Sequence, residues 1–281
     1  MQSLVDSARR KGSILVAGLD PMPSRLPEDV LDSDLPEADS VWRFCLGVLE
    51  AVEPEVAAVK LQAAYFERLG PVGMQIYADL IAASEEMGLP TIADVKRGDI
   101  GDVAAAYAEA HLSVYGAHCV TVNPYMGEDA VIPFVEETRR QGRGGGVFVL
   151  VATSNPSAGT FQFGGEPPLF ETAAGLVEEM GGGDGDYPDV GAVVGATRPE
   201  TGRRARELLP DTLFLAPGYG AQGGGADGVR ALLDVRDGGV FVNSSRAVIY
   251  AYENSEKGYR EAAREAARNT REDLRSIGAR M

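Results

Sequence analysis

The sequence predicts an α/β fold, a single (β/α)8 TIM barrel. Short apolar runs rich in β-branched residues recur along the whole chain of 281 residues. Segments with the apolar spacing of amphipathic helices separate most of these runs. Near-continuous apolar strands that alternate with helices are typical of a parallel sheet covered by helices. Because there are eight such runs, a closed barrel is favoured over an open doubly wound sheet, and one barrel typically takes about 250 residues.

The expected strands follow one another along the chain. They are SILVAGLDP from Ser13, VAAVKLQ from Val56, TIADVK from Thr91, CVTVNP from Cys119, VFVLVATSN from Val147, DVGAVVGAT from Asp189, LFLAPGYG from Leu213 and VFVNSSR from Val240. Between them, helical spacing is clear near Trp42, Tyr77 and Phe134. The alternation of strand and helix therefore runs through the chain.

We expect residues 1–281 to form one barrel domain with a terminal helix at each end. The segment SEKGYREAAREAARNTREDLRSIG is rich in alanine, arginine and glutamate, which predicts a C-terminal helix on the outside with a solvated charged face. The glycine-rich, acidic stretch from Gly181 to Asp189 resembles a linker. The strand pattern resumes at once after it, which favours a surface loop.

The composition argues against several classes of protein. A formal net charge of -16 and a pI near 4.6 argue against a nucleic-acid partner, because phosphate contacts need a basic face. The first residues lack the pattern of a signal peptide, and no run approaches the ~18 apolar residues of a membrane helix. Cys45 and Cys119 are too few for a disulfide framework and are expected to be buried as small hydrophobic residues. We therefore expect a soluble cytoplasmic protein with no membrane partner.

Polar residues gather at the predicted carboxyl ends of the strands, where the chemistry of such barrels takes place. Strand side chains alternate in direction, so Asp94 and Lys96 share a face, and Lys60 faces them from the neighbouring strand. In strand order the polar residues are Asp20, Lys60, Asp94 with Lys96, Asn123, Ser154, Thr197, Gln222 just beyond the seventh strand and Arg246 just beyond the eighth.

This cluster has two interpretations. One is a structural ion-pair network that closes the mouth of the barrel. Burying an ion pair is seldom a net gain in stability, however, because desolvation can match the Coulomb attraction. With Asp99 the cluster becomes an alternating array of Lys60, Asp94, Lys96 and Asp99. The array favours a functional site.

The motif D-x-K-x-x-D, formed by Asp94, Lys96 and Asp99, resembles that of orotidine 5'-phosphate decarboxylase, in its longer-chain bacterial and archaeal subfamily. A lysine ending the second strand and LDP ending the first also match. PGYGAQGG after the seventh strand and NSSRAVIY after the eighth are similar to that family's phosphate-binding segments. The resemblance covers nearly the whole barrel. It implies a carboxy-lyase that converts orotidine 5'-monophosphate to UMP in pyrimidine biosynthesis.

The resemblance also implies catalytic roles for the matching residues. Lys96 would protonate a C6 carbanion, flanked by Asp94 and Lys60. Asp99 would reach into the active site of the other subunit of a homodimer. The sequence departs from the family pattern at Val103, where a hydroxyl residue usually touches the ribose bound by the partner.

For substrate binding, the resemblance implies that Asp20 holds the ribose hydroxyls and that Ser154 contacts the pyrimidine. It assigns the phosphate to Gln222 and Arg246. It implies no metal and no cofactor.

The chemistry of the residues agrees with this resemblance, because loss of CO2 from C6 leaves a carbanion that the ring cannot delocalise. A fixed ammonium group can stabilise it and then donate a proton. Two alternatives remain open. Related keto-sugar-phosphate decarboxylases and hexulose-phosphate synthases use the same motif with magnesium and are expected to carry a carboxylate where Lys60 stands. The second alternative is a catalytically silent barrel that binds nucleotides.

Overall fold

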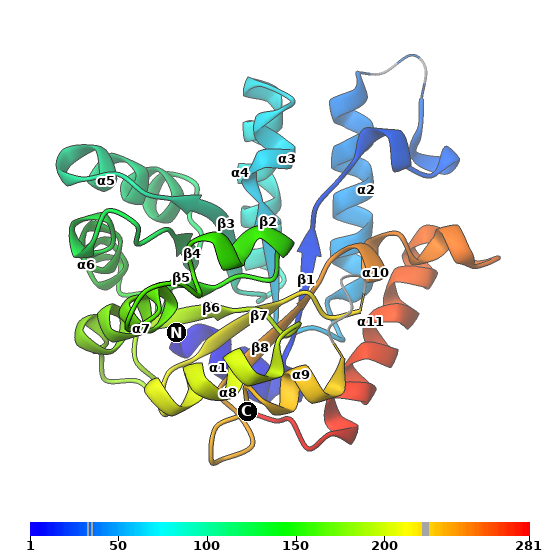
Figure 1. The fold of residues 1–281 in the computed structure, drawn as a ribbon. Helices are drawn as coiled ribbons and strands as arrows, with labels where there is room; N and C mark the ends of the chain where they lie inside the picture. The colour runs from blue at the N-terminus through cyan, green and yellow to red at the C-terminus, as the bar shows by residue number, and fades with distance from the viewer. Residues whose placement is uncertain (33, 35, 221–224) are drawn as a thin grey trace.

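The structure is a computed structural model that describes residues 1–32, 34, 36–220 and 225–281. A closed barrel of parallel strands forms its centre, with β8 pairing back onto β1 (Figure 1). The closed barrel predicted from the sequence is confirmed, and each expected strand coincides with an observed one. The strands are β1 (Leu15–Leu19), β2 (Ala58–Gln62), β3 (Thr91–Arg97), β4 (Cys119–Val122), β5 (Gly146–Ala152), β6 (Val190–Val194), β7 (Phe214–Pro217) and β8 (Val240–Ser244).

Helices connect the strands and surround the barrel (Figure 1). Helix α11 at the C-terminal end packs along α2 on the outside. All eight strands belong to one barrel, and we propose that the chain forms a single domain. The helices are α1 (Gln2–Lys11), α2 (Glu37–Val52), α3 (Ala63–Glu67), α4 (Pro71–Glu86), α5 (Gly101–Ala108), α6 (Ile132–Gln141), α7 (Leu169–Met180), α8 (Pro199–Leu208), α9 (Ala226–Arg230), α10 (Arg246–Ile249) and α11 (Tyr259–Ser276).

Apolar side chains fill the amino-terminal end of the barrel. Ile92, Phe148 and Phe241 belong to one buried cluster, which also contains Leu4 and Val5 from α1. Helix α1 therefore closes the amino-terminal end of the barrel. Burying a side chain of this size contributes about 1.5–3 kcal/mol. Because this apolar layer stabilises the amino-terminal end of the barrel, polar residues can occupy the carboxyl ends of the same strands.

Three smaller predictions concern a loop, the cysteines and membrane segments. The glycine-rich stretch is a loop between α7 and β6, where Arg139 binds Asp189 through hydrogen bonds of 2.7 and 3.0 Å. Cys45 and Cys119 are free and buried, as predicted, and burial raises the pKa of the Cys119 thiol to about 11. Within the described part of the chain, every helix is too short or too polar to cross a membrane.

Candidate active site

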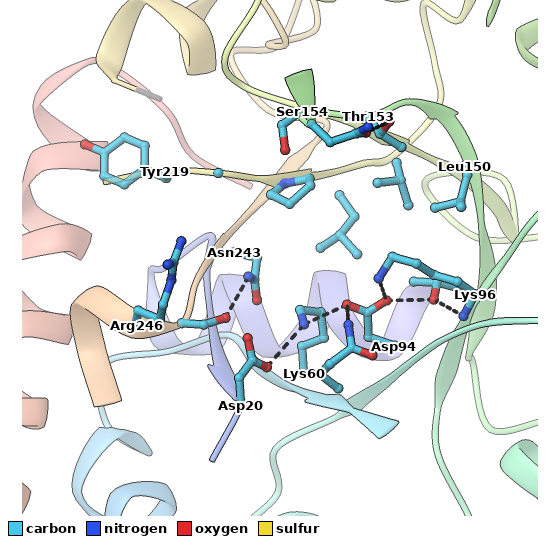
Figure 2. A pocket seen from close by; sticks show the side chains of 18 residues that line it. Asp20, Lys60, Asp94, Lys96, Leu150, Thr153, Ser154, Tyr219, Asn243 and Arg246 are labelled. Atoms are coloured by element: carbon cyan, nitrogen blue, oxygen red, sulfur yellow. Dashed lines mark hydrogen bonds and ion pairs between the residues drawn. The ribbon is translucent and has the colours of Figure 1, made fainter. Parts of the chain in front are cut away.

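A cavity of about 380 Å³ lies at the carboxyl ends of the strands. This volume is within the range of small-molecule sites. In Figure 2, Asp20, Lys60, Asp94 and Lys96 form a row along one side, and Ser154 lies across the cavity from them. Six of the residues predicted from the sequence line the cavity, namely Asp20, Lys60, Asp94, Lys96, Ser154 and Arg246.

Asp94 is the centre of the charged row. Its Oδ2 accepts hydrogen bonds from Lys60 Nζ at 2.8 Å and Gln62 Nε2 at 3.1 Å. Its Oδ1 accepts hydrogen bonds from Lys96 Nζ and, at 2.9 Å, from Thr121 Oγ1. These four donors match the four lone-pair positions of a carboxylate. Burial alone would raise the pKa of Asp94, but the ammonium groups of Lys60 and Lys96 outweigh burial and hold the pKa below its usual range.

Lys60 lies between two carboxylates. Its Nζ is 2.8 Å from Asp94 Oδ2 and 3.7 Å from Asp20 Oδ1, and its side chain is only 5% exposed. Burial alone would lower the pKa of Lys60, but the attraction of Asp20 and Asp94 raises the pKa above its ordinary value. Lys60 is therefore buried and carries its positive charge at neutral pH.

Lys96 is much more accessible than Lys60. Its side chain is 42% exposed, although its Nζ is paired with Asp94. Its backbone has φ = 47°, in the left-handed region that residues with side chains rarely adopt. Unusual backbone conformations of this kind cluster at active sites. Lys96 thus combines a fixed position with access to a ligand in the cavity.

Strand β3 is irregular at this point. Its pairing with β4 shifts between Ala93 and Arg97, so that residues 94–96 lie opposite Thr121 alone. Such a β-bulge can redirect a side chain next to an active site. The predicted convergence of Asp94 and Lys96 is confirmed. Both line the cavity, and Val95 between them packs with Ala93 in a buried apolar cluster, so the side chains still alternate although the ladder to β4 is irregular.

The predicted phosphate end lies after β7 and β8. Arg246 is the first residue of α10 and lines the cavity. Gly218 and Gly220, after β7, have φ values of 99° and 76°, which favour glycine. Gln222 lies outside the described residues, so its phosphate contact stays a prediction.

Some residues noted in the sequence do not reach this cavity. Asp99 and Thr197 are not among its described lining residues, and Asn123 lines an adjacent apolar cavity instead. The Asp99 carboxylate accepts a hydrogen bond of 2.9 Å from the backbone N–H of Ile100. Over the described residues, no group of three or more His, Cys, Asp or Glu side chains is placed to hold a metal ion.

Among the polar lining residues that sequence reasoning missed, three lie on barrel strands: Gln62, Thr121 and Asn243. Each interrupts an apolar strand two positions after a side chain that faces the barrel interior. The period of two that identified Lys60 could have found them as well. They were missed because neutral polar residues carry a weaker signal than opposed charges.

A closed barrel with a cluster of titratable side chains in a cavity at the strand ends has the construction of a (β/α)8-barrel enzyme. The chain belongs to the Orotidine 5'-phosphate decarboxylase / HUMPS family, whose family model matches residues 13–262. The resemblance found in the motifs is therefore confirmed.

Individual relatives agree with this membership. The chain is 43% identical to orotidine 5'-phosphate decarboxylase of Rhodopirellula baltica, over 88% of this chain and 87% of that one. It is 40% identical to the protein of the same name from Deinococcus radiodurans, over 97% of this chain and 96% of that one. The solved structure of Leishmania donovani OMP decarboxylase matches with a TM-score of 0.78 and 31% identity, covering 98% of this chain and 96% of that one.

Proposed function

We propose that the protein decarboxylates orotidine 5'-monophosphate to UMP, without a metal or cofactor, and that Lys96 protonates C6. The observation that carries this proposal is the ion-paired row of Asp20, Lys60, Asp94 and Lys96 in a cavity of about 380 Å³. Family membership supports the same substrate.

In the proposed reaction the bond between C6 and the carboxylate carbon breaks, and its electron pair stays on C6. CO2 leaves as a neutral molecule. The Lys96 ammonium group stabilises the carbanion and then transfers a proton to form the C6–H bond. The neutral amine regains its proton from solvent, which the 42% exposed side chain of Lys96 can contact.

Asp94 has a second role in this proposal. It is anionic and would lie against the substrate carboxylate, where repulsion between like charges favours departure as CO2. Lys60 limits the repulsion because its Nζ lies 2.8 Å from Asp94 and its side chain is buried. The substrate phosphate would bind Arg246 and Gln222, the ribose Asp20 and the pyrimidine Ser154. A remote phosphate group can supply the binding energy that holds the reacting carbon in place.

We expect the purified protein to convert orotidine 5'-monophosphate to UMP at a rate that excess EDTA does not change. The reaction is followed by the fall in ultraviolet absorbance. The magnesium-dependent relatives are expected to carry a carboxylate at the position of Lys60, so loss of activity in EDTA would favour that alternative. Binding of the nucleotide without turnover would instead indicate a catalytically silent barrel.

We further propose that the protein is a homodimer and that Asp99 completes the active site of the partner. Asp99 precedes a surface of exposed apolar side chains on and before α5, with Ile100 54%, Val103 49% and Tyr107 36% exposed. Exposed apolar patches of this kind are typical of protein interfaces. Val103 offers the partner a methyl surface in place of the hydroxyl usual in the family. We also propose a cytoplasmic location, which the two free cysteines fit.

Mixing two inactive variants tests the shared site. In a dimer of Lys96→Ala with Asp99→Ala, one of the two sites keeps both an intact Lys96 and an intact Asp99 if Asp99 acts in the partner. Random exchange of subunits in equal amounts should then restore about a quarter of the wild-type activity, since half of the dimers are mixed and each has one intact site. Each variant alone is the control. No recovery after subunit exchange would show that Asp99 does not act across an interface.

A further inference from the structure

The bulge in β3 is held by hydrogen bonds to one side chain of β4, that of Thr121. Thr121 Oγ1 accepts hydrogen bonds from the backbone N–H groups of Val95 and Lys96, both at 3.0 Å. It donates its own hydrogen to Asp94 Oδ1 at 2.9 Å. Thr121 is buried, with 1% of the residue exposed. One hydroxyl group therefore contacts the backbone of Lys96 and the carboxylate that pairs with the Lys96 ammonium.

These contacts replace the regular ladder between β3 and β4. Thr121 stands opposite the three residues of the bulge, and backbone pairing resumes where Asn123 N–H donates to Arg97 O at 2.7 Å. Without the hydroxyl, two backbone N–H groups would lose their acceptor inside the protein, at a cost larger than that of an ordinary hydrogen bond. The threonine hydroxyl thus stabilises the left-handed conformation of Lys96, with φ = 47°.

The hydroxyl group has no capacity left for a ligand. A threonine hydroxyl has one donor and two acceptor positions. All three are occupied, by Asp94, Val95 and Lys96. Although Thr121 lines the cavity, its hydroxyl is positioned to act on Lys96 and Asp94 and not on the substrate.

We propose that Thr121 is a positioning residue that fixes the Lys96 ammonium group at the reacting carbon through the β3 bulge. This inference rests on the proposed function. Removing the hydroxyl group would release the backbone at Lys96 and remove one of the four hydrogen bonds to Asp94. The expected consequence is slower chemistry with little change in nucleotide binding.

The test compares three variants. We expect Thr121→Val, which keeps the shape and removes the hydroxyl, to lower kcat by about 10²-fold, the cost of misplacing a reacting group by about 1 Å. KM and the Kd of UMP should change by less than about threefold, because the contacts that bind the nucleotide equally in the ground state and the transition state are unaffected. Thr121→Ser should restore kcat. Thr138→Val is the matched control, since Thr138 is a buried threonine of α6 whose hydroxyl donates to Phe134 O at 2.8 Å; its kcat should equal that of the wild type.

A kcat of Thr121→Val equal to that of the wild type would overturn the proposal, as would failure of Thr121→Ser to restore it. If Thr121→Val does not fold, Thr121→Cys takes its place with the same expected fall in kcat, because a thiol is a weak donor and acceptor. Hydrogen exchange of the amides of Val95 and Lys96 should accelerate in the folded variant. That measurement needs no substrate. If the wild-type protein did not turn over orotidine 5'-monophosphate, the proposed function would be refuted, but hydrogen exchange would still test the role of Thr121. Unchanged exchange would contradict the role.

Discussion

Replacing Lys96 by alanine is expected to lower turnover of orotidine 5'-monophosphate by at least about 10⁴-fold, because both electrostatic stabilisation and proton donation are lost. The fold should survive. Asp94 keeps hydrogen bonds from Lys60, Gln62 and Thr121, and the side chain of Lys96 is 42% exposed. Turnover is measured by ultraviolet absorbance, and binding of UMP by calorimetry should persist.

The chain offers a matched control for this variant. Lys257 has a side chain that is 40% exposed and pairs with Glu261 and Glu265, so it resembles Lys96 in exposure and charge pairing. It lies between α10 and α11, and Lys257→Ala should keep full activity. A fully active Lys96→Ala variant would refute the assignment of the proton donor.

Replacing Asp94 by asparagine is expected to lower both activity and stability. The NH2 group of the asparagine side chain would face at least one of the donors that now bind the Asp94 carboxylate. The buried ammonium group of Lys60 would also lose its anionic partner at 2.8 Å. Breaking a buried ion pair by removing one partner costs about 3–5 kcal/mol. Loss of the charge should lower kcat by about 10²–10³-fold. Asp227→Asn, which breaks an exposed pair with Arg230 at 2.8 Å, should cost at most about 1 kcal/mol.

The same variant should change how stability depends on pH. In the wild type, the lowered pKa of Asp94 contributes stability above about 3.8 that is lost as the pH falls through the folded pKa. The raised pKa of Lys60 contributes stability below about 10.5 that is lost as the pH rises through the folded pKa. Between these limits the contribution of the pair is constant.

In Asp94→Asn, only Asp20 still offsets the burial of Lys60, and we expect the folded pKa of Lys60 to fall below the unfolded value. The variant should then become more stable as the pH rises toward about 10.5. Urea unfolding at several pH values measures this slope. A flat profile in the variant, equal to that of the wild type, would show that Asp20, at 3.7 Å from Lys60 Nζ, suffices to keep Lys60 charged.

Much of the fold was predictable because its signals are local. Each buried strand reads as a short apolar run, and most of these runs are separated by segments with helical apolar spacing. The positions of Asp20, Lys60 and Asp94 followed from the rule that chemistry lies at the carboxyl ends of barrel strands. No contact between distant segments was needed for these predictions.

The arrangement around Lys96 was beyond the sequence. Alternation predicts that Asp94 and Lys96 share a face, but it does not predict that residues 94–96 form a bulge, whose position depends on the pairing of β3 with β4. Thr121 matters because it stands opposite that bulge. Asp99 is separated from the cavity of its own chain for a similar reason, because the loop after β3 carries it away from the lining residues.

By itself the sequence determined the order of the eight strands and the presence of opposed charges at their ends, because hydrophobic periodicity and residue type are properties of short segments. Only the tertiary structure decided which neutral side chains complete the charged row and how Lys96 is oriented. Those features depend on the register between neighbouring strands, and register is set when the whole barrel closes and its interior packs.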